Sequence, residues 1–548
     1  GTMITENGTG AEVGLPAAGG IDGTVTHHNV TLNLEDVALT ANGSADDGYG
    51  IITNGTSTGI NISLKGGSVN APNGIGIYFP PADSTLTIDG TTITGTTGVA
   101  VKGGDVTIKG GAQISGTGEK REPSPVNSGV TNTGSAVYVE GNYDRDINVN
   151  IESGMFTSVN STAVQMLKDD TTTSDTETIV ISGGTFSDKP ADEFVYTGLK
   201  AVETDDRNYT INKLTDVYLD GTGGNDSNSG TDSSNAVRTL EHALKLVAED
   251  GVIYICGEVE LTSSLTVSDV TIKRAEGYGG RLLRTRSINN GETPVDLTLR
   301  NVVIDGNRDV VITTDVGELL TVGRGSTVRL EAGTELKNNY TTAVYVNQAL
   351  GDQPRGSLII DGGKITGNGT ADGFVSENPD GEDWIYGSSG GGIYNSGYVE
   401  MISGEISGNT AEAGGGIHNN ARGEILLSGG VIKDNTSLYN GGGIQTVSDS
   451  VTLDGASIIN NKAKNGYGGG ISVESSSGTD AVVFAMKSGT IAGNISAYSN
   501  TGSGIFGWSY YGGPIDISIS GGTLGDAEGE RVIALYGTAD AWPKLNLS

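Results

Sequence analysis

The chain has 548 residues, of which 89 are glycine and only 12 are proline, so neither a collagen-like chain nor a proline-rich disordered chain fits. Its 66 acidic and 32 basic residues give a net charge of −34, which repels nucleic acid and leaves neutral glycans, cationic partners and divalent ions open. No stretch approaches the ~20 apolar residues of a membrane span, so we expect no membrane insertion.

The first part of the chain alternates short runs of β-branched residues with glycine turns. Examples are ISLKGGSVN at 62–70, LTIDGTTITG at 86–95 and VTIKGGAQISG at 106–116. Such runs predict β-strands joined by tight turns. The pattern is lost over 191–214, so we place a boundary near Lys213 and expect an N-terminal β-helix segment over residues 1–213.

A new pattern begins near Val217. Thr239 is a candidate N-cap, and Leu240, Ala243, Leu244 and Val247 form one apolar face. We expect a short capping helix near 239–249, which would cover the open end of a stack of coils.

The segment NDSNSGTD at 225–232 alternates oxygen-bearing side chains at Asp226, Asn228 and Asp232. This spacing resembles a calcium loop, but the EF-hand pattern needs an oxygen donor where Gly230 stands and a later glutamate. The alternatives are a calcium ion and a turn closed by side-chain hydrogen bonds. We assign no other metal or cofactor.

The one cysteine, Cys256, lies in the apolar run GVIYICGEVEL. A single cysteine excludes a disulfide within the chain. We expect it to be a small buried side chain on a strand.

The second part of the chain is periodic. Glycine triplets begin at Gly390, Gly414, Gly441 and Gly468, in steps of 24, 27 and 27 residues. An Ile followed three residues later by Asn repeats in phase, and its asparagines are Asn368, Asn409, Asn435, Asn461 and Asn494. A repeat of this length predicts a solenoid whose coils each contain three short strands.

The repeated residues suit the corners of such coils. Glycine supplies positive φ and lets the backbone of one coil approach the next. Asparagine tolerates the left-handed region and can hydrogen-bond its copies, so Asn409, Asn435 and Asn461 should form a ladder with coils ~4.8 Å apart. The predicted fold is all-β, a right-handed parallel β-helix in two segments, 1–213 and 214–548.

One coil carries an insertion. The step is 26 residues from Asn409 to Asn435 but 41 from Asn368 to Asn409, so 41 − 26 = 15 extra residues fall in an acidic and aromatic loop at 369–389. Insertions in solenoids often form the binding face, and glycosidic bond cleavage needs paired carboxylates. The candidate catalytic residues are Asp383, Asp380 and Glu377, and the candidate sugar-stacking residues are Trp384 and Tyr386. The alternative is a solvated acidic loop.

Further candidate ligand contacts follow from the repeat register. His418 should stack between Tyr394 and Gln445 of the neighbouring coils, and Tyr439 and Tyr467 should project nearby. These residues either line a groove or are simply exposed.

Aromatic residues also gather in the segment GIFGWSYYGG at 504–513, in a chain with only 5% aromatic residues. The members that we expect to contact a ligand are Trp508, Tyr510 and Tyr511. The cluster predicts either a sugar-stacking platform or an apolar end cap.

These patterns resemble known β-helix proteins. Residues 217–261 resemble the opening of right-handed parallel β-helix domains of the pectate-lyase-like superfamily. The GGGI and IxxN repeats resemble those of polymorphic outer-membrane and adhesin-type proteins. The segment ISGGTFSDKPADEF at 181–194 resembles the closing segment of β-helix modules in surface proteins of gut Gram-positive bacteria. The resemblance implies a parallel β-helix and an extracellular location, either secreted or attached to a bacterial cell wall.

Two functions stay open at this point. One is an extracellular glycoside hydrolase that acts on a neutral or host-type oligosaccharide with two carboxylates, similar to the β-helix type of lacto-N-biosidase. That similarity implies two catalytic aspartates seven residues apart, whereas the residue seven before Asp383 is Ser376. The other is a non-catalytic adhesin or glycan-binding module of a surface protein. In both cases we expect a monomer.

Overall fold

The computed structural model divides the chain into two compact units, Gly1–Leu214 (unit 1) and Thr215–Ser548 (unit 2), which are described separately below. For 3–6, 11–13, 374–376 and 384–386 only the backbone is described. The described residues are 3–6, 11–13, 29–43, 48–120, 133–141, 145–168, 176–289, 291–310, 316–370, 374–376, 384–386, 389–420, 422–447, 450–475, 481–498, 501–509, 512–525, 531–537 and 542–548.

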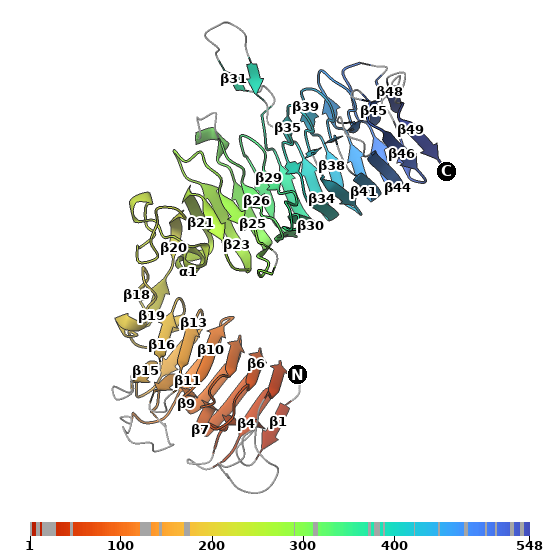
Figure 1. Ribbon diagram of the computed structural model, residues 1–548. Helices are drawn as coiled ribbons and strands as arrows, with labels where there is room; N and C mark the ends of the chain where they lie inside the picture. Colours follow the sequence, from red (N-terminus) through yellow and green to blue (C-terminus); the bar gives the residue numbers. More distant parts are fainter. Residues whose placement is uncertain are drawn as a thin grey trace. The chain divides into compact units, whose positions relative to one another are not determined.

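Unit 1 is a parallel β-helix whose described strands form two sheets (Figure 1). The strands of the larger sheet are β1 (Met3–Glu6), β2 (Ala11–Val13), β4 (Ala38–Ala41), β5 (Ile51–Thr53), β7 (Ser68–Phe79), β9 (Thr92–Val101), β11 (Gln113–Gly116), β12 (Val137–Glu140), β14 (Met155–Ser158), β15 (Val164–Leu167), β17 (Thr185–Phe186), β18 (Lys200–Glu203) and β19 (Tyr209–Asn212). The strands of the smaller sheet are β3 (Thr31–Glu35), β6 (Asn61–Lys65), β8 (Thr85–Asp89), β10 (Gly104–Lys109), β13 (Ile147–Ile151) and β16 (Glu177–Ile181). A 3-10 helix, η1, spans Asp192–Phe194.

The C-terminal end of unit 1 is closed by the hairpin of β18 and β19. Strand β19 pairs antiparallel with β17, whereas the preceding coils pair parallel, as β11 does with β14. The hairpin therefore covers the last edge of the sheet, which would otherwise expose unpaired backbone groups.

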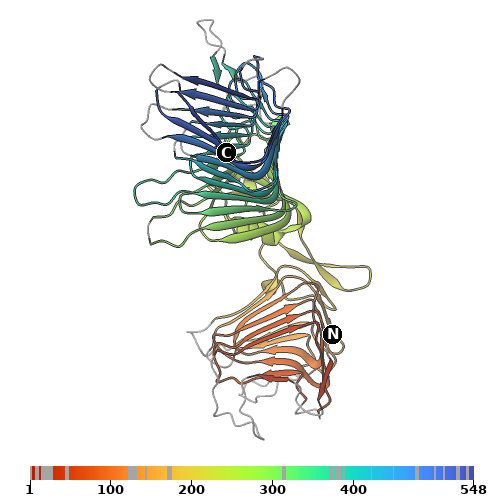
Figure 2. The ribbon, with the colours of Figure 1, turned by 90° about the vertical axis from the view of Figure 1, so that its right-hand side faces the viewer.

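Unit 2 is a second parallel β-helix (Figures 1 and 2). Its long sheet contains β20 (Leu214–Asp220), β21 (Val247–Gly257), β23 (Leu265–Arg274), β25 (Asp296–Asp305), β27 (Thr327–Glu331), β28 (Glu335–Lys337), β30 (Ser357–Thr366), β34 (Tyr398–Ser407), β37 (Glu424–Leu427), β38 (Val431–Lys433), β41 (Ser450–Ile459), β44 (Val482–Ala492), β46 (Ile515–Ile519), β47 (Thr523–Leu524) and β49 (Lys544–Leu547). Its second sheet contains β22 (Val259–Leu261), β24 (Leu283–Thr285), β26 (Leu320–Val322), β29 (Val344–Val346), β33 (Ile393–Asn395), β36 (Ile417–Asn419), β40 (Ile444–Thr446), β43 (Ile471–Glu474), β45 (Ile505–Ser509) and β48 (Ile533–Gly537). Its third sheet contains β35 (Thr410–Ala411), β39 (Thr436–Ser437) and β42 (Lys462–Ala463).

Each complete coil in the middle of unit 2 contributes to all three sheets. The coil that starts at β36 continues through β37 and β38 to β39, and the next coil repeats this order from β40 to β42. The three-sided coil predicted from the repeat is therefore confirmed. Aliphatic side chains such as Ile417, Ile425 and Ile432 are fully or almost fully buried inside the coil and stack on their copies in the next one.

The glycine triplets form a corner of the coil, as predicted, and each position has its own reason. Gly414 has φ +62°, a backbone conformation that favours glycine. A Cβ atom on Gly415 would lie 2.5 Å from the carbonyl oxygen of Gly442, and one on Gly416 would lie 2.7 Å from that of Gly443. Side chains at these positions would push neighbouring coils apart.

The asparagine ladder is confirmed. Asn409 donates from its backbone N–H and from Nδ2 to Oδ1 of Asn435, both at 3.0 Å, and Asn435 repeats both bonds to Asn461 at 3.0 Å. The ladder continues from Asn461 to Asn494. All four side chains are almost completely inaccessible to solvent.

One expectation about this corner was wrong. The ladder asparagines do not adopt positive φ; the residue before each of them does, as at Asp434 with φ +56° and Asn460 with φ +58°. The left-handed residue turns the chain, and the following asparagine then points inward, where it satisfies backbone groups of adjacent coils.

An arginine extends the ladder beyond the repeat. Arg274, fully buried, donates to Oδ1 of Asn339 at 2.9 Å and to the carbonyl oxygen of Gly317 at 2.9 Å. Asn339 in turn donates to Oδ1 of Asn368 at 3.0 Å. The guanidinium thus fills the ladder position of the coil between Arg274 and Asn339, where Asn307 instead has φ +50° and donates its Nδ2 to the carbonyl oxygen of Arg274.

The predicted capping helix is present but shorter than expected. Helix α1 spans Leu240–Leu246, and the Thr239 side chain accepts a hydrogen bond from the backbone N–H of His242. The helix ends at Leu246 because Val247 begins strand β21, a run rich in β-branched residues. Leu246 packs with Val217 and Val237 around Gly230, so α1 covers the first coils of unit 2.

Cys256 differs from its predicted environment. It lies on β21, but it is half-buried because it alternates with the inward residues Ile255 and Gly257 and so faces outward. The 3-10 helices of unit 2 are η2 (Ser233–Asn235) and η3 (Arg308–Val310).

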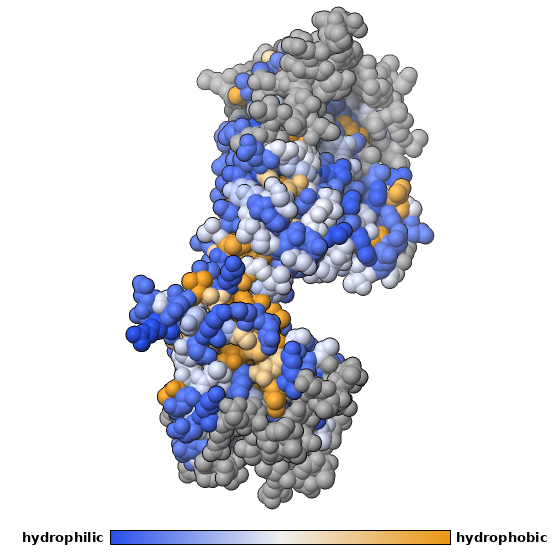
Figure 3. All heavy atoms as spheres, turned by 90° about the vertical axis from the view of Figure 1, so that its left-hand side faces the viewer, coloured by the Kyte–Doolittle hydropathy of each residue, from blue (hydrophilic) through white to orange (hydrophobic). Residues whose placement is uncertain are grey.

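Among the helices within the described ranges, none has the length and apolar character needed to cross a membrane. On the face of the molecule in Figure 3, hydrophilic side chains cover most of the coloured surface of unit 2, with small apolar groups between them. This surface is consistent with the high net charge of the chain.

Candidate functional site

One row of side chains runs in register along the outer face of the second sheet of unit 2. All its members but the last alternate with buried inward residues, so they point away from the coil. We name this set the outer row; it consists of Glu260, Arg284, Thr321, Tyr345, Tyr394, His418, Gln445, Ser472, Phe506 and Ala534.

The predicted order of Tyr394, His418 and Gln445 on neighbouring coils is confirmed. The Tyr345 and Tyr394 rings stack with centroids 5.2 Å apart and planes at 8°, and the His418 ring follows at 5.1 Å from Tyr394. Asn420 donates a hydrogen bond from Nδ2 to the Tyr394 hydroxyl. His418 and Gln445 are only 8% and 7% exposed, so this part of the row is a packed ladder with little open surface.

A chain of hydrogen bonds joins His418 to a carboxylate on β43. Oε1 of Glu474 accepts from Nε2 of Gln445 at 2.9 Å, so the Gln445 oxygen must face the other way. That oxygen lies 2.8 Å from Nδ1 of His418. His418 therefore carries its proton on Nδ1, because an amide oxygen only accepts.

Burial controls the protonation of His418. Desolvation of the ring lowers the pKa of His418 to about 4, although the bond to Gln445 acts in the opposite direction. The side chain is thus neutral at neutral pH.

An aromatic cluster surrounds the C-terminal end of the outer row. We define it as Tyr467, Tyr498, Phe506, Trp508 and Tyr536. The rings of Tyr467 and Phe506 stack at 4.6 Å, and Trp508 meets Tyr467 edge-on at 6.2 Å. Tyr498 lies 5.8 Å from Tyr467, and Tyr536 lies 5.6 Å from Phe506.

The cluster has a buried base and an exposed rim. Phe506 is 2% exposed, whereas Tyr498 is 55% exposed and Tyr536 is 42% exposed. An apolar end cap needs the buried ring but not the exposed ones. The exposed rings leave aromatic surface available to a ligand.

Glu474 lies at the edge of this cluster. It pairs in register with Trp508, which pairs in turn with Tyr536, so the three residues stand side by side on β43, β45 and β48. Its Oε1 also accepts hydrogen bonds from Nδ2 of Asn440 at 3.0 Å and from the Ser472 hydroxyl at 2.6 Å. Asn440 further accepts a bond from the backbone N–H of Tyr467, which ties the carboxylate to the aromatic cluster.

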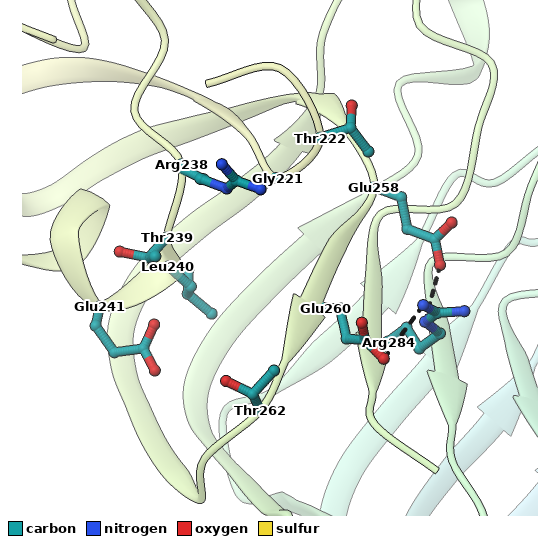
Figure 4. Close-up of a pocket in the computed structure, with 10 residues that line it drawn as sticks. All are labelled: Gly221, Thr222, Arg238, Thr239, Leu240, Glu241, Glu258, Glu260, Thr262 and Arg284. Atoms are coloured by element: carbon teal, nitrogen blue, oxygen red, sulfur yellow. Dashed lines mark ion pairs between the residues drawn. The ribbon is translucent and has the colours of Figure 1, made fainter. Parts of the chain in front are cut away.

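A cavity of about 600 Å³ lies at the opposite end of the second sheet of unit 2, between α1, β22 and β24 (Figure 4). Arg284 stands between Glu258 and Glu260 and forms ion pairs with them at 3.1 and 3.2 Å. Glu241 lies on the other side of the cavity and accepts a hydrogen bond from Ser263. Arg238 and Arg284 carry two positive charges against the three negative charges of the glutamates that line the cavity, so it is a mixed-charge surface at the end of the outer row.

The carboxylates of the candidate calcium segment accept backbone hydrogen bonds. Asp226 accepts hydrogen bonds from the backbone N–H groups of Arg238 and Thr239, and Asp232 accepts from those of Ser234 and Asn235. Side-chain hydrogen bonds of Asn225 and Asp232 close local turns, as one alternative predicted, and calcium binding by this segment stays a prediction. Within the described ranges, no group of three His, Cys, Asp or Glu side chains is arranged to hold a metal ion.

The predicted acids Asp383, Asp380 and Glu377 lie outside the described residues, as do Tyr510 and Tyr511. Trp384 and Tyr386 belong to β32 (Trp384–Tyr386), which pairs antiparallel with β31 (Phe374–Ser376) in a hairpin that projects from the stack of coils (Figure 1).

Of the other predicted contacts, Tyr467 and Trp508 meet in the aromatic cluster. Tyr439 is 46% exposed, and among the described residues it makes no ring contact with the cluster. Sequence reasoning missed Glu474, Tyr498 and Tyr536. Glu474 could have been found from the repeat, because the register of GGGISVE places it two residues after an outer-row position. Tyr498 and Tyr536 lie where the repeat spacing is irregular, so the sequence gives no signal for them.

Comparison of the chain with family models, with curated proteins and with solved structures finds no match.

Proposed function

We propose that unit 2 binds a glycan on the aromatic cluster, as part of an extracellular bacterial surface protein. The observation that carries this proposal is the exposed rings of Tyr498 and Tyr536, next to the half-buried Trp508 and beside a carboxylate held by three hydrogen bonds. Aromatic rings offer a rigid apolar face with little conformational entropy to lose, and the apolar faces of sugar rings pack on them.

Glu474 supplies the polar half of such a site. Its Oε1 is occupied by Asn440, Gln445 and Ser472, which hold the carboxylate in one orientation. Its Oε2 has no hydrogen bond from the described residues and is the acceptor for a ligand donor. A few convergent polar groups among aromatic surfaces are typical of ligand sites.

We propose hydrolysis of a neutral or host-type glycan as a second function, because Glu474 is a positioned carboxylate beside sugar-stacking rings. A two-carboxylate mechanism requires a second acid, and Asp383, Asp380 and Glu377 in the insertion are the sequence candidates. Separation of the two carboxyl groups by ~5–5.5 Å would favour retention of anomeric configuration, and ~6.5–9.5 Å would favour inversion.

The test of binding is calorimetric titration of the full chain with plant, milk-type, mucin-type and chitin-derived oligosaccharides. We expect Tyr498→Ala combined with Tyr536→Ala to weaken binding by at least tenfold, since each stacking ring contributes ~1 kcal/mol or more. Trp542→Ala is the matched control, because Trp542 is 61% exposed and lies outside the aromatic cluster.

The same panel separates the two functions. Products in the wild-type incubation that disappear in Asp383→Asn or Asp380→Asn would establish hydrolysis. Binding without products would establish a non-catalytic module. Wild-type protein that neither binds nor cleaves any member of the panel would refute the proposal for this site.

A further inference from the structure

Within the described part of unit 2, Glu474 is a carboxylate without a paired cation. Among the described residues no lysine, arginine or histidine lies within ion-pair distance of it, although other carboxylates of unit 2 are paired, as Glu405 is with Lys433 and Asp454 with Lys487. Its three donors are two amides and a hydroxyl, all uncharged. These bonds orient the group but leave its charge uncompensated.

The surroundings of Glu474 would raise the energetic cost of that charge. The side chain is half-buried, and Trp508, its neighbour on β45, belongs to the aromatic cluster. Aromatic surfaces exclude water, and an uncompensated charge beside them is unfavourable. The same arrangement is favourable for a cation, because aromatic faces carry negative electrostatic potential that adds to the attraction of the carboxylate.

We propose that Glu474 and the aromatic cluster together bind an ammonium group of the ligand. They would therefore select a glycan with a free, protonated amino sugar over its N-acetylated form. This inference rests on the proposed glycan binding and names the ligand class of that site. The ammonium group would donate to Oε2 of Glu474 while its sugar ring lies against the exposed aromatic rim. The net charge of −34 further favours approach of a cationic glycan.

The probe pair is glucosamine trisaccharide and its fully N-acetylated counterpart, titrated into the full chain. We expect the free amine to bind about tenfold more tightly at low salt, and we expect this preference to shrink as sodium chloride rises from ~0.05 to ~0.5 M. Glu474→Gln keeps an oxygen acceptor for the three internal donors and removes the charge. In this variant the ratio of the two affinities should fall to about one.

Glu249→Gln is the matched charge control, because Glu249 is exposed on β21 and lies outside both the outer row and the aromatic cluster. It should leave the ratio unchanged. Equal binding of both probes by the wild type, or a ratio that survives Glu474→Gln in protein with an unchanged melting midpoint, would overturn the ammonium assignment and leave glycan binding in place. Binding of neither these probes nor the wider oligosaccharide panel would overturn both.

Discussion

At the outer surface of unit 2, the chemistry of single side chains is set by their neighbours. Cys256 faces outward next to Tyr254, and its thiol contacts the Tyr254 carbonyl oxygen at 3.8 Å. Partial burial, with a smaller contribution from the negative charge of Asp220, raises the pKa of Cys256 to about 11. The thiolate, which is the reactive species, is therefore scarce.

This environment predicts slow alkylation of Cys256. At pH 8 the thiolate fraction should be ~100-fold lower than for a cysteine with the ordinary pKa of 9.0. Mass spectrometry of iodoacetamide-treated native protein should show correspondingly slow modification. The same protein in denaturant should react at the rate of a free thiol, and equal native and denatured rates would contradict the prediction.

His418 predicts a pH-dependent term in stability. Its pKa is about 4 in the folded protein and 6.5 in the ordinary state, so between these values the unfolded chain binds a proton that the folded chain does not. The stabilisation is complete above pH 6.5 and is lost as the pH falls to about 4, by up to about 3 kcal/mol. Urea unfolding of the wild type and His418→Phe at several pH values measures it.

His242 is an internal control in this experiment, since it is present in both proteins and its lowered pKa affects them equally. The difference in free energy of unfolding between wild type and variant should shrink toward pH 4. A difference that does not change with pH would show that His418 titrates normally.

At the scale of the element, the asparagine ladder joins successive coils. Asn435 donates to the carbonyl oxygen of Ile406 at 2.9 Å and to Asn461, and it accepts two bonds from Asn409. Its removal would leave buried donors and acceptors unsatisfied on two neighbouring coils.

We expect Asn435→Ala to lower the free energy of unfolding by ~3–5 kcal/mol. Asn465→Ala is the matched control, because Asn465 is exposed and its side chain makes no hydrogen bond with a described residue; it should change stability by less than ~0.5 kcal/mol. Equal effects of the two substitutions in urea unfolding would mean that the ladder does not stabilise the fold.

Gly443 and Gly367 should differ in how much stability is lost when a side chain is introduced. A Cβ on Gly443 would lie 2.7 Å from the Gly470 carbonyl oxygen, so Gly443→Ala should destabilise by ~2 kcal/mol or more. Gly367 has φ +62° with open space around it, and Asn460 occupies the equivalent corner of a later coil at φ +58°. Gly367→Asn should therefore cost less than ~1 kcal/mol. Thermal unfolding of the two variants measures both losses of stability. A larger loss for Gly367→Asn than for Gly443→Ala would show that packing at the corner is unimportant.

At the scale of the whole molecule, the chain contains two units with separate cores. The outer row and the aromatic cluster belong entirely to unit 2, Thr215–Ser548. The proposed site uses no residue of unit 1.

We therefore expect a fragment of residues 215–548 to bind the ligand with the affinity of the full chain. Calorimetry measures the two dissociation constants, and circular dichroism confirms that the fragment retains its β structure. A folded fragment with much weaker binding would show that unit 1 contributes to the site.

The sequence by itself determined the all-β class, the three-sided coil, the corner glycines, the ladder and the order of Tyr394, His418 and Gln445. These features depend on a constant repeat, in which equivalent residues stack one coil apart. It also located the N-cap Thr239, because a capping side chain bonds to backbone only three residues away.

Only the tertiary structure decided where the pattern breaks. Glu474 meets Asn440 and Gln445 of the preceding coil. The aromatic cluster unites residues from two strands, β45 and β48, with two tyrosines from bends, Tyr467 and Tyr498. Arg274 replaces a ladder asparagine from a strand two coils away. Contacts between distant residues depend on the length and course of each connecting loop, so no local spacing in the chain encodes them. The acidic residues of the insertion follow no repeat and remain a sequence prediction.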